Sequence, residues 1–343
     1  MSNTNTEVLT TAYEKLQGAI TQANTVLPEL QEAVEKGNLD NYATVSQLEE
    51  KTNGINVLKR KFKGEFGRNL YWADGSSGVV AESKKKEQID ACVTAGIDSV
   101  VLPIQTKYNS GNLVIVNDLD NDLKWLKYAQ AQGLKVSCIK IHNYGYTSDD
   151  IASNYTNFKT QYSAIIDTVS TKFQNLNIDI FTVMNEETQY FMGMDNADNS
   201  FILDLFTTVK AKGFKAGITT AGYNYSYRVS ENILSNSDVI CANTYVRIGC
   251  KRERTTNLDS IKAWQEDDIN DWLTYMKGKY PNAEIILSET GCMDYWAGLQ
   301  TPSSFTYPNE LKVTTNNKAV DIYYTGMFET MSEKVDRVWN WFN

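Results

Sequence analysis

The stretch Asp120–Ile141 reads DNDLKWLKYAQAQGLKVSCIKI and places a helix, a glycine and a strand in direct succession. Apolar residues recur with helical spacing up to Gln132. Gly133 follows where the end of a helix commonly needs a left-handed residue. Residues 135–141 are a short apolar run of the kind found in buried strands. The stretch therefore predicts an α/β unit in which a helix leads directly into a strand.

The same succession recurs from about residue 62 onward, and Ala95-Gly96-Ile97 marks another junction of this kind. The expected strands are Asn69–Trp72, Ser99–Ile104, Lys135–Ile141, Ile178–Met184, Lys215–Thr220, Val239–Tyr245, Glu284–Ser288 and Arg337–Trp341. The expected helices between them are Glu82–Ala95, Asp120–Gln132, Asp150–Phe173, Ser200–Lys212, Asp267–Lys279 and Lys318–Glu333.

Strands that alternate with helices form right-handed βαβ units and a parallel sheet. Eight units in about 280 residues fit a closed (β/α)8 TIM barrel better than an open doubly wound sheet. The first strand also lacks the GxGxxG turn of dinucleotide-binding folds. Because the sequence stops two residues after the eighth strand, we expect an α/β barrel that lacks a full eighth helix. Its uncovered apolar surface would be buried by the N-terminal segment or by a partner.

Residues 1–60 have a different character. Apolar residues from Leu9 to Val34 follow alternating steps of four and three, the heptad pattern of a coiled coil, and Pro28 predicts a kink or break. Two interpretations stay open: a pair of helices folded onto the main domain, or a stalk that forms a homo-oligomer or docks on a partner. We divide the chain into an N-terminal helical stalk or docking segment, residues 1–60, and a barrel, residues 61–343.

Composition excludes several classes of protein. A formal net charge of −9 argues against a nucleic-acid partner. No apolar run approaches the roughly 20 residues of a membrane-spanning helix. The chain has one histidine, His142, which excludes metal sites built on two or three histidines. We therefore expect no metal and no other cofactor.

Cysteine usage and the N-terminus bear on the compartment. The five cysteines are widely spaced without a CxxC pair, which predicts buried free thiols. The first ten residues lack the basic and apolar regions of a signal peptide. We expect synthesis in the cytoplasm and, if the protein leaves it, release by lysis, free or in an assembled virion.

Two expected strands end in acidic residues, and the C-terminal strand ends are where barrels carry function. The fourth ends TVMNEE at Thr182–Glu187, and the seventh reads IILSETG over Ile285–Gly291. Strand alternation places Glu289 on the same side as Ile285 and Leu287, so we expect Glu289 to point into the barrel mouth. Two facing carboxylates suit glycosidic-bond cleavage, where one donates a proton while the other attacks carbon or activates water.

Asn185-Glu186 after strand four and Glu289 after strand seven resemble the signature of the retaining (β/α)8 glycoside hydrolases, the clan that includes cellulases and β-mannanases. The resemblance implies that Glu186 is the acid/base, that Asn185 binds the sugar 2-hydroxyl and that Glu289 is the nucleophile. Glu187 follows Glu186 directly, and the clan pattern selects Glu186.

The resemblance extends to other strand ends. It implies that Tyr245 hydrogen-bonds the nucleophile and that His142 occupies a polar substrate-binding position. Trp339 and Trp341 resemble the clan's tryptophan that lies beneath the sugar. Aromatic residues in the loops are further candidates, because their rings stack on pyranose faces. The loop aromatics taken as substrate-binding are Tyr71, Trp72 and Trp296.

These features predict an endo-acting, retaining glycoside hydrolase that cleaves a bacterial-surface or plant-type polysaccharide. The alternative is a non-catalytic glycan-binding or structural phage tail protein built on a hydrolase-like barrel. Residues 41–51 motivate it, because they resemble helical connectors of phage tail fibres. The two hypotheses combine in a virion-borne enzyme that trims surface glycan.

Overall fold

The computed structural model describes residues 62–74, 78–109, 111–144, 148–186, 199–245, 258–292 and 318–341. The predicted stalk at residues 1–60 and Trp296 lie outside these ranges, so the division into two domains stays a prediction. Within the described ranges, none of the helices combines the length and the apolar character needed to span a membrane.

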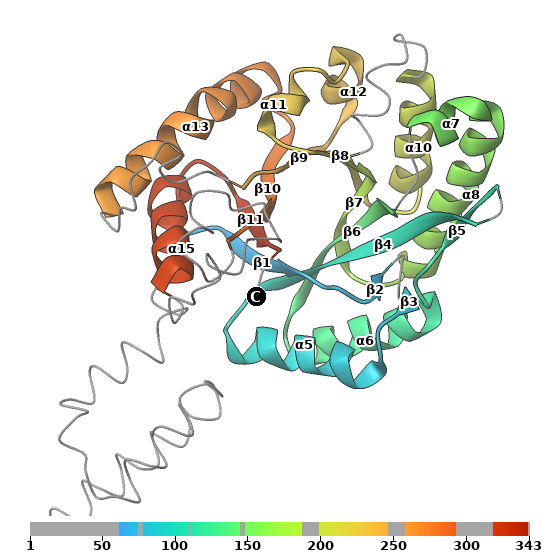
Figure 1. Ribbon diagram of the computed structural model, residues 1–343, viewed down its shortest axis with the longest axis horizontal. Helices are drawn as coiled ribbons and strands as arrows, with labels where there is room; N and C mark the ends of the chain where they lie inside the picture. The colour runs from blue at the N-terminus through green and yellow to red at the C-terminus, as the bar shows by residue number, and fades with distance from the viewer. Residues whose placement is uncertain are drawn as a thin grey trace, which may run out of the picture.

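The fold is a closed barrel of eight parallel strands, which confirms the predicted fold class (Figure 1). Each strand pairs with its neighbour, and β1 pairs with both β4 and β11 to close the ring. The barrel strands are β1 (Glu65–Asn69), β4 (Ser99–Asn109), β6 (Lys135–Tyr144), β7 (Ile178–Asn185), β8 (Lys215–Thr220), β9 (Val239–Asn243), β10 (Glu284–Thr290) and β11 (Arg337–Asn340).

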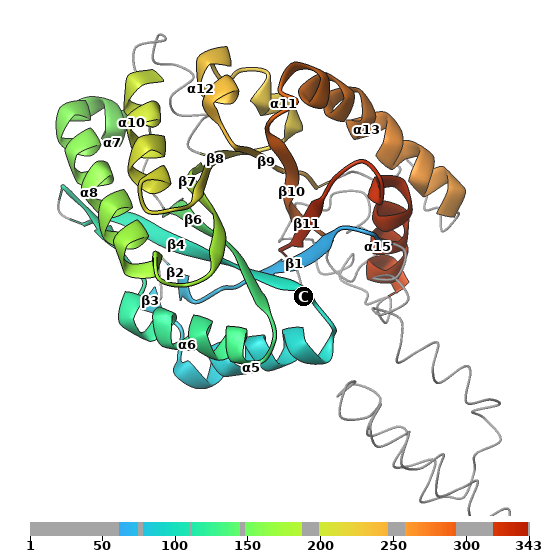
Figure 2. The ribbon, with the colours of Figure 1, turned by 180° about the vertical axis from the view of Figure 1, so that it is seen from behind.

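Helices surround the barrel, and α5 and α6 lie side by side on one flank (Figure 2). The helices are α5 (Glu82–Thr94), α6 (Leu119–Ala131), α7 (Ser148–Ser153), α8 (Tyr155–Phe173), α10 (Asn199–Lys210), α11 (Tyr223–Ser226), α12 (Glu231–Asn236), α13 (Leu258–Lys279) and α15 (Lys318–Met331). Three short strands are added: the hairpin β2 (Ala73–Asp74) and β3 (Gly78–Val79), and β5 (Asn112–Ile115), which pairs antiparallel with β4.

Local signals act as the sequence predicts at the helix-to-strand junctions. Gly96 has φ 64° and Gly133 has φ 87°, so each residue takes the left-handed conformation that ends a helix before a strand. The carboxylate of Asp118 accepts a hydrogen bond from the backbone N of Asn121 and caps α6. The two glycines thus fix the points at which β4 and β6 begin, and Asp118 fixes the start of α6.

The first strand differs from the prediction Asn69–Trp72, because β1 is Glu65–Asn69. Its centre is Gly67, which carries none of the usual strand signal. A Cβ at Gly67 would lie 2.5 Å from both Ser99 Oγ and Trp339 Cδ1. The glycine is therefore needed for close packing inside the barrel, a tertiary requirement that strand propensity does not report.

Two apolar clusters separate the two faces of the sheet. One contains helix residues together with alternate strand residues such as Ile285 and Leu287. The other contains only strand residues, among them Cys138, Ile286 and Trp339, and therefore fills the barrel interior. The four described cysteines, Cys92, Cys138, Cys241 and Cys292, are buried free thiols, as predicted.

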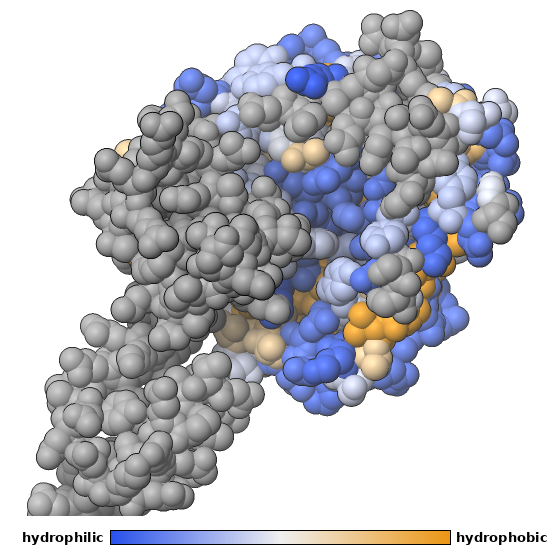
Figure 3. Space-filling model, viewed as in Figure 1, coloured by the Kyte–Doolittle hydropathy of each residue, from blue (hydrophilic) through white to orange (hydrophobic). Residues whose placement is uncertain are grey.

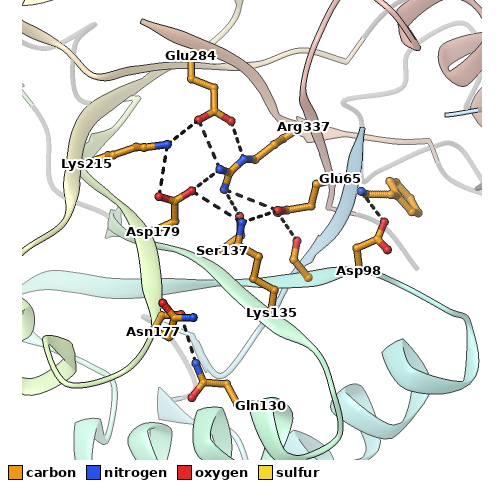
Figure 4. A network of polar contacts seen from close by, with 12 residues as sticks. Glu65, Asp98, Gln130, Lys135, Ser137, Asn177, Asp179, Lys215, Glu284 and Arg337 are labelled. Carbon is orange, nitrogen blue, oxygen red and sulfur yellow. Dashed lines mark hydrogen bonds and ion pairs between the residues drawn. The ribbon is translucent and has the colours of Figure 1, made fainter. Parts of the chain in front are cut away.

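The N-terminal ends of the strands are closed by a charge network centred on Arg337 (Figure 4). Its guanidinium lies 2.6 Å from Glu284, donates to Ser137 Oγ at 2.8 Å and bonds Asp179. Lys135 contacts Glu65 at 2.9 Å, and Lys215 bridges Asp179 and Glu284. Each of these charged residues is the first or second residue of its strand. The network balances three acidic side chains with three basic ones and leaves the opposite end of the barrel for chemistry.

Candidate active site

Glu186 and Glu289 are aimed by irregularities in the strands that carry them. The register shifts between Leu287 and Glu289 where β10 pairs with β9, and between Thr182 and Asn185 where β7 pairs with β8. Strict alternation would place Glu289 with Leu287 on the helix side of the sheet. Irregular pairing of this kind redirects side chains, and it is frequent next to active sites.

The prediction that Glu289 points into the mouth rested on its sharing a side with Ile285 and Leu287. Glu289 does lie in the site, but it does not share a side with those two residues. The two apolar residues pack in the cluster that contains helix residues, whereas Ile286 faces the barrel interior. The alternation rule fails here because it assumes regular pairing with both neighbouring strands.

Glu186 follows β7 in a strained conformation. Its φ is 66°, and it is the one residue other than glycine with positive φ in the described part of the chain. Its backbone N donates to Thr219 O at 2.8 Å, which anchors the turn to β8. A glutamate held in this conformation needs surrounding structure that fixes it, and such strain clusters at functional sites.

Both carboxylate oxygens of Glu289 are bonded. Lys140 Nζ from β6 bonds Oε1, and Tyr245 OH from the end of β9 donates to Oε2 at 3.0 Å. Glu289 is 5% exposed, and its own backbone carbonyl accepts from Thr244 N at 2.7 Å. The carboxylate is therefore fixed in orientation and has a positive charge in direct contact.

Asn243 connects the two carboxylate-bearing strand ends. Its Nδ2 donates to Glu186 Oε1 at 2.7 Å and to Asn185 Oδ1 at 3.2 Å, and its Oδ1 accepts from Ser288 Oγ at 2.7 Å. The sequence analysis assigned no role to Asn243. Its position two residues before Tyr245, on the same side of the strand, is the signal that could have identified it.

The electrostatics separate the two glutamates. Burial raises the pKa of Glu186, the negative charge of Glu289 raises it further, and the bond from Asn243 and the charge of Lys140 only partly oppose this. Burial and the nearby Glu289 raise the pKa of Tyr245 well above its usual value, so its hydroxyl stays a donor. Glu186 is thus suited to carry a proton, while Glu289 faces a cation and a hydroxyl donor.

Trp341, His142 and Lys140 pack together beside the carboxylates. Trp341 N donates to Thr290 O at 2.9 Å, and its ring stacks on His142 with centroids 6.0 Å apart and planes at 17°. Lys140 Nζ lies 5.0 Å from the centroid of the Trp341 ring. Burial lowers the pKa of His142 to about 4, so the imidazole is neutral at pH 7. Its Nδ1 lies 3.3 Å from Gln105 Oε1.

Two predicted sugar-binding tryptophans are instead core residues. Trp72 is fully buried, and its ring lies 5.3 Å from Lys85 Nζ on α5. Trp339 is fully buried in the interior cluster, where it contacts the position of Gly67. Neither ring has exposed surface for a sugar. A strand-end tryptophan carries the same sequence signal in both roles, and only the packing decides between them.

Tyr71 lies at the surface, as a sugar-stacking residue would require. The residue is 43% exposed, yet its backbone is held firmly: the Gln88 amide bonds its backbone N and O at 3.0 and 3.1 Å. Its hydroxyl donates to Asp74 at 2.6 Å. Tyr144, at the end of β6, is 40% exposed and interacts electrostatically with Tyr71. Both residues are exposed, and they lie near enough to each other to interact electrostatically.

The mouth of the barrel is polar. In the view of Figure 3, hydrophilic residues gather around a hollow near the middle of the face. No group of three or more His, Cys, Asp or Glu side chains in the described ranges could hold a metal ion. Glu187 and Trp296, which the sequence analysis also considered, lie outside those ranges.

Comparison of the chain with known proteins identifies its family. The model of the cellulase family, glycosyl hydrolase family 5, matches residues 63–325. A search of curated proteins finds no match.

Solved structures of glycoside hydrolases share the fold. A GH113 β-mannanase from Alicyclobacillus acidocaldarius in complex with ManMIm superposes with a TM-score of 0.61 at 15% identity, covering 82% of this chain and 87% of that one. A complex of a GH113 β-1,4-mannanase gives 0.59 at 16% identity, with 82% and 88% covered. Cel5A of Thermotoga maritima, a mutant form with cellobiose, gives 0.52 at 16% identity, with 83% and 91% covered. Since the family model spans most of the chain and the barrel carries two glutamates at its strand ends, the chain belongs to the cellulase family, glycosyl hydrolase family 5.

Proposed function

We propose that the protein is a retaining glycoside hydrolase in which Glu186 is the acid/base and Glu289 the nucleophile. The observation that carries the proposal is the contrast between the two carboxylates. Glu186 is held toward its protonated form, and Glu289 is bonded by an ammonium group and a phenol. One proton donor and one nucleophile are what the double-displacement reaction requires.

The reaction follows from these positions. Glu186 gives its proton to the glycosidic oxygen as the bond from that oxygen to the anomeric carbon breaks. Glu289 attacks the anomeric carbon and forms a glycosyl ester. Glu186, now ionised, then takes a proton from water, whose oxygen attacks the same carbon and releases Glu289 as a carboxylate. Two inversions give net retention.

Asn185 is suited to hold the sugar during these steps. It is 1% exposed, and its Nδ2 has no hydrogen-bond partner among the residues that the structure describes, while Asn243 already bonds its Oδ1. A buried amide donor left without a partner is costly. We assign this donor to the 2-hydroxyl of the sugar at the cleaved bond, with Trp341 beneath the ring and His142 beside it.

We propose a β-linked hexose polysaccharide, of the mannan or glucan type, as the substrate class. The similar solved structures include a GH113 β-1,4-mannanase and Cel5A of Thermotoga maritima in complex with cellobiose, which supports this class. Tyr71 and Tyr144 would stack on a sugar unit further along the chain, and a second stacking position suits endo action on a polymer.

The test measures reducing ends released from a panel of mannans, glucans and bacterial surface polysaccharides. Glu186→Gln and Glu289→Gln should each lower the rate on the cleaved polymer by at least about 10³-fold. Glu87→Gln on α5, where the side chain is 64% exposed, is the matched control and should keep full activity. Proton NMR of the first product should show the anomeric configuration of the substrate.

Two results would refute the proposal. A product of inverted configuration would exclude Glu289 as a nucleophile. Glycan binding without cleavage of any polymer would instead favour the non-catalytic binding protein.

Attachment to a virion through residues 1–60 is a separate proposal, which rests on the heptad pattern and on the resemblance of residues 41–51 to helical connectors of phage tail fibres. Light scattering on the full chain checks the oligomerisation that a coiled-coil stalk implies. A monomer at all concentrations would count against the stalk.

A further inference from the structure

Lys140 lies at the centre of the site, although the sequence analysis gave it no part in hydrolysis. It is on β6 with its side chain fully buried, and its ammonium group bonds Glu289 Oε1. The same group lies 5.0 Å from the centroid of the Trp341 ring. Lysine is almost never fully buried unless its charge is paired. The cost of burying this charge calls for an explanation.

We propose that Lys140 is a positioning residue for the nucleophile, which orients Glu289 and holds the charge of the site constant through both steps of the reaction. The inference rests on the proposed function and extends it. Tyr245 fixes Oε2 and Lys140 fixes Oε1, so the carboxylate plane cannot rotate about its terminal bond.

The charge balance supports this role. Before reaction, Lys140 is positive, Glu289 negative and Glu186 protonated, so the three groups sum to zero. In the glycosyl ester, Glu289 is neutral, Glu186 has lost its proton and Lys140 is still positive, and the sum is again zero. The cation thus favours the ionised nucleophile first and the ionised base afterwards, and both steps take place in a neutral site.

The chain offers a matched pair outside the site. Lys85 on α5 is also fully buried, bonds Asp122 on α6 at 2.5 Å and lies 5.3 Å from the centroid of a tryptophan ring, that of Trp72. Asp122 also accepts from Asn117 at 2.8 Å. This pair joins two outer helices and contacts neither Glu186 nor Glu289. Replacing Lys85 therefore measures the cost of losing a buried lysine, with no expected effect on the reaction.

The first experiment measures pairing without reference to activity. Thermal unfolding is compared for wild type, Lys140→Met, Glu289→Gln and the double variant. Lys140→Met leaves a buried carboxylate without its cation, whereas the double variant leaves neither charge unpaired. The double variant should therefore unfold at a higher temperature than Lys140→Met. A double variant destabilised by the sum of the two single changes would overturn the pairing.

The second experiment measures the pH dependence of kcat/KM on the polymer that the wild type cleaves. In the described residues, the titratable groups that interact with Glu186 are Glu289, Lys140 and Tyr245. Removing the cation should raise the pKa of Glu186, and with it the basic limb of the profile, by up to about one pH unit. The rate at the optimum should fall about 10²- to 10³-fold.

Three further variants and controls make the result decisive. Lys140→Arg keeps a positive charge and should retain the wild-type basic limb at a reduced rate, because the guanidinium places its charge differently. Lys85→Met should lower the unfolding temperature and leave the basic limb unchanged. If Lys140→Met does not fold, Lys140→Gln takes its place as the neutral variant and should show the shifted limb.

Unchanged basic limbs in the neutral variants, or rates within tenfold of wild type, would overturn the inference. An inactive wild type would overturn the proposed function, and the positioning role with it, while the unfolding experiment would still decide whether the two charges pair.

Discussion

Replacing Asn243 with leucine tests how the site holds its acid/base. Asn243 is 2% exposed, and its Nδ2 donates to Glu186 Oε1 at 2.7 Å, while its Oδ1 accepts from Ser288 Oγ at 2.7 Å. Leucine has nearly the same volume and no polar atom. The substitution therefore removes the bond to Glu186 and leaves the Ser288 hydroxyl without its acceptor.

The expected magnitude follows from the bond to the carboxylate. A hydrogen bond to a charged group contributes about 1.5–3 kcal/mol, and about 1.4 kcal/mol corresponds to one pKa unit. The bond from Asn243 lowers the pKa of Glu186, so its loss should raise that pKa by about 1–2 units. The first step needs the protonated acid, so the basic limb of kcat/KM should move up by the same amount. The second step needs the ionised base and should become slower near neutral pH.

The substitution should also destabilise the fold. A buried hydroxyl left unsatisfied costs about 1–3 kcal/mol, which corresponds to a fall in Tm of about 2–6 °C. Asn117→Leu is the matched control, because Asn117 is 8% exposed and donates to a buried carboxylate, Asp122, outside the site. It should lower Tm without moving the pH profile. A basic limb for Asn243→Leu that coincides with the wild-type limb would refute the reasoning.

Four further predictions follow from the geometry. The one histidine, His142, should titrate by NMR near pH 4 rather than 6.5. Because the unfolded chain takes up the proton first, the free energy of unfolding should fall by about 2–3 kcal/mol between pH 6.5 and 4. His142→Gln should remove that loss. Arg337→Met leaves three carboxylates without their central cation and should lower the free energy of unfolding in urea by about 3–5 kcal/mol. A decrease below about 1 kcal/mol would show that the network does not stabilise the fold. Gly67→Ala should cost about 1–3 kcal/mol, since its Cβ would lie 2.5 Å from Trp339, and a wild-type Tm would contradict the close packing. Tyr71→Ala should raise KM about 2- to 10-fold for long polymers and leave KM for the shortest cleaved oligosaccharide unchanged. Equal effects on both substrates would show that Tyr71 does not form a remote subsite.

Local patterns predicted the order of the elements because they are repeated over a few residues. The strand Lys215–Thr220 has the predicted bounds, and Gly96 and Gly133 end helices where the sequence indicates. The first strand was misplaced, because Gly67 is explained by its contact with Trp339 from the other end of the chain. Short-range periodicity carries no information about such contacts.

The candidate site was predicted in part. Glu186, Glu289 and Tyr245 were identified from motifs at strand ends, and the structure brings them together. Trp72 and Trp339 were assigned to the sugar site and lie in the core. An aromatic residue at a strand end is equally compatible with both environments, so its sequence position alone cannot decide.

The sequence by itself determined which residues can do acid–base and nucleophilic chemistry and at which strand ends they stand, because strands and helices have periods that a few neighbouring residues reveal. Only the tertiary structure decided where those residues point and what accompanies them. The irregular pairing that turns Glu289 inward, the bond from Lys140 and the bridge formed by Asn243 all depend on contacts between strands that are distant in the sequence. Closing eight strands into a ring creates those contacts, and no segment of the chain contains them alone.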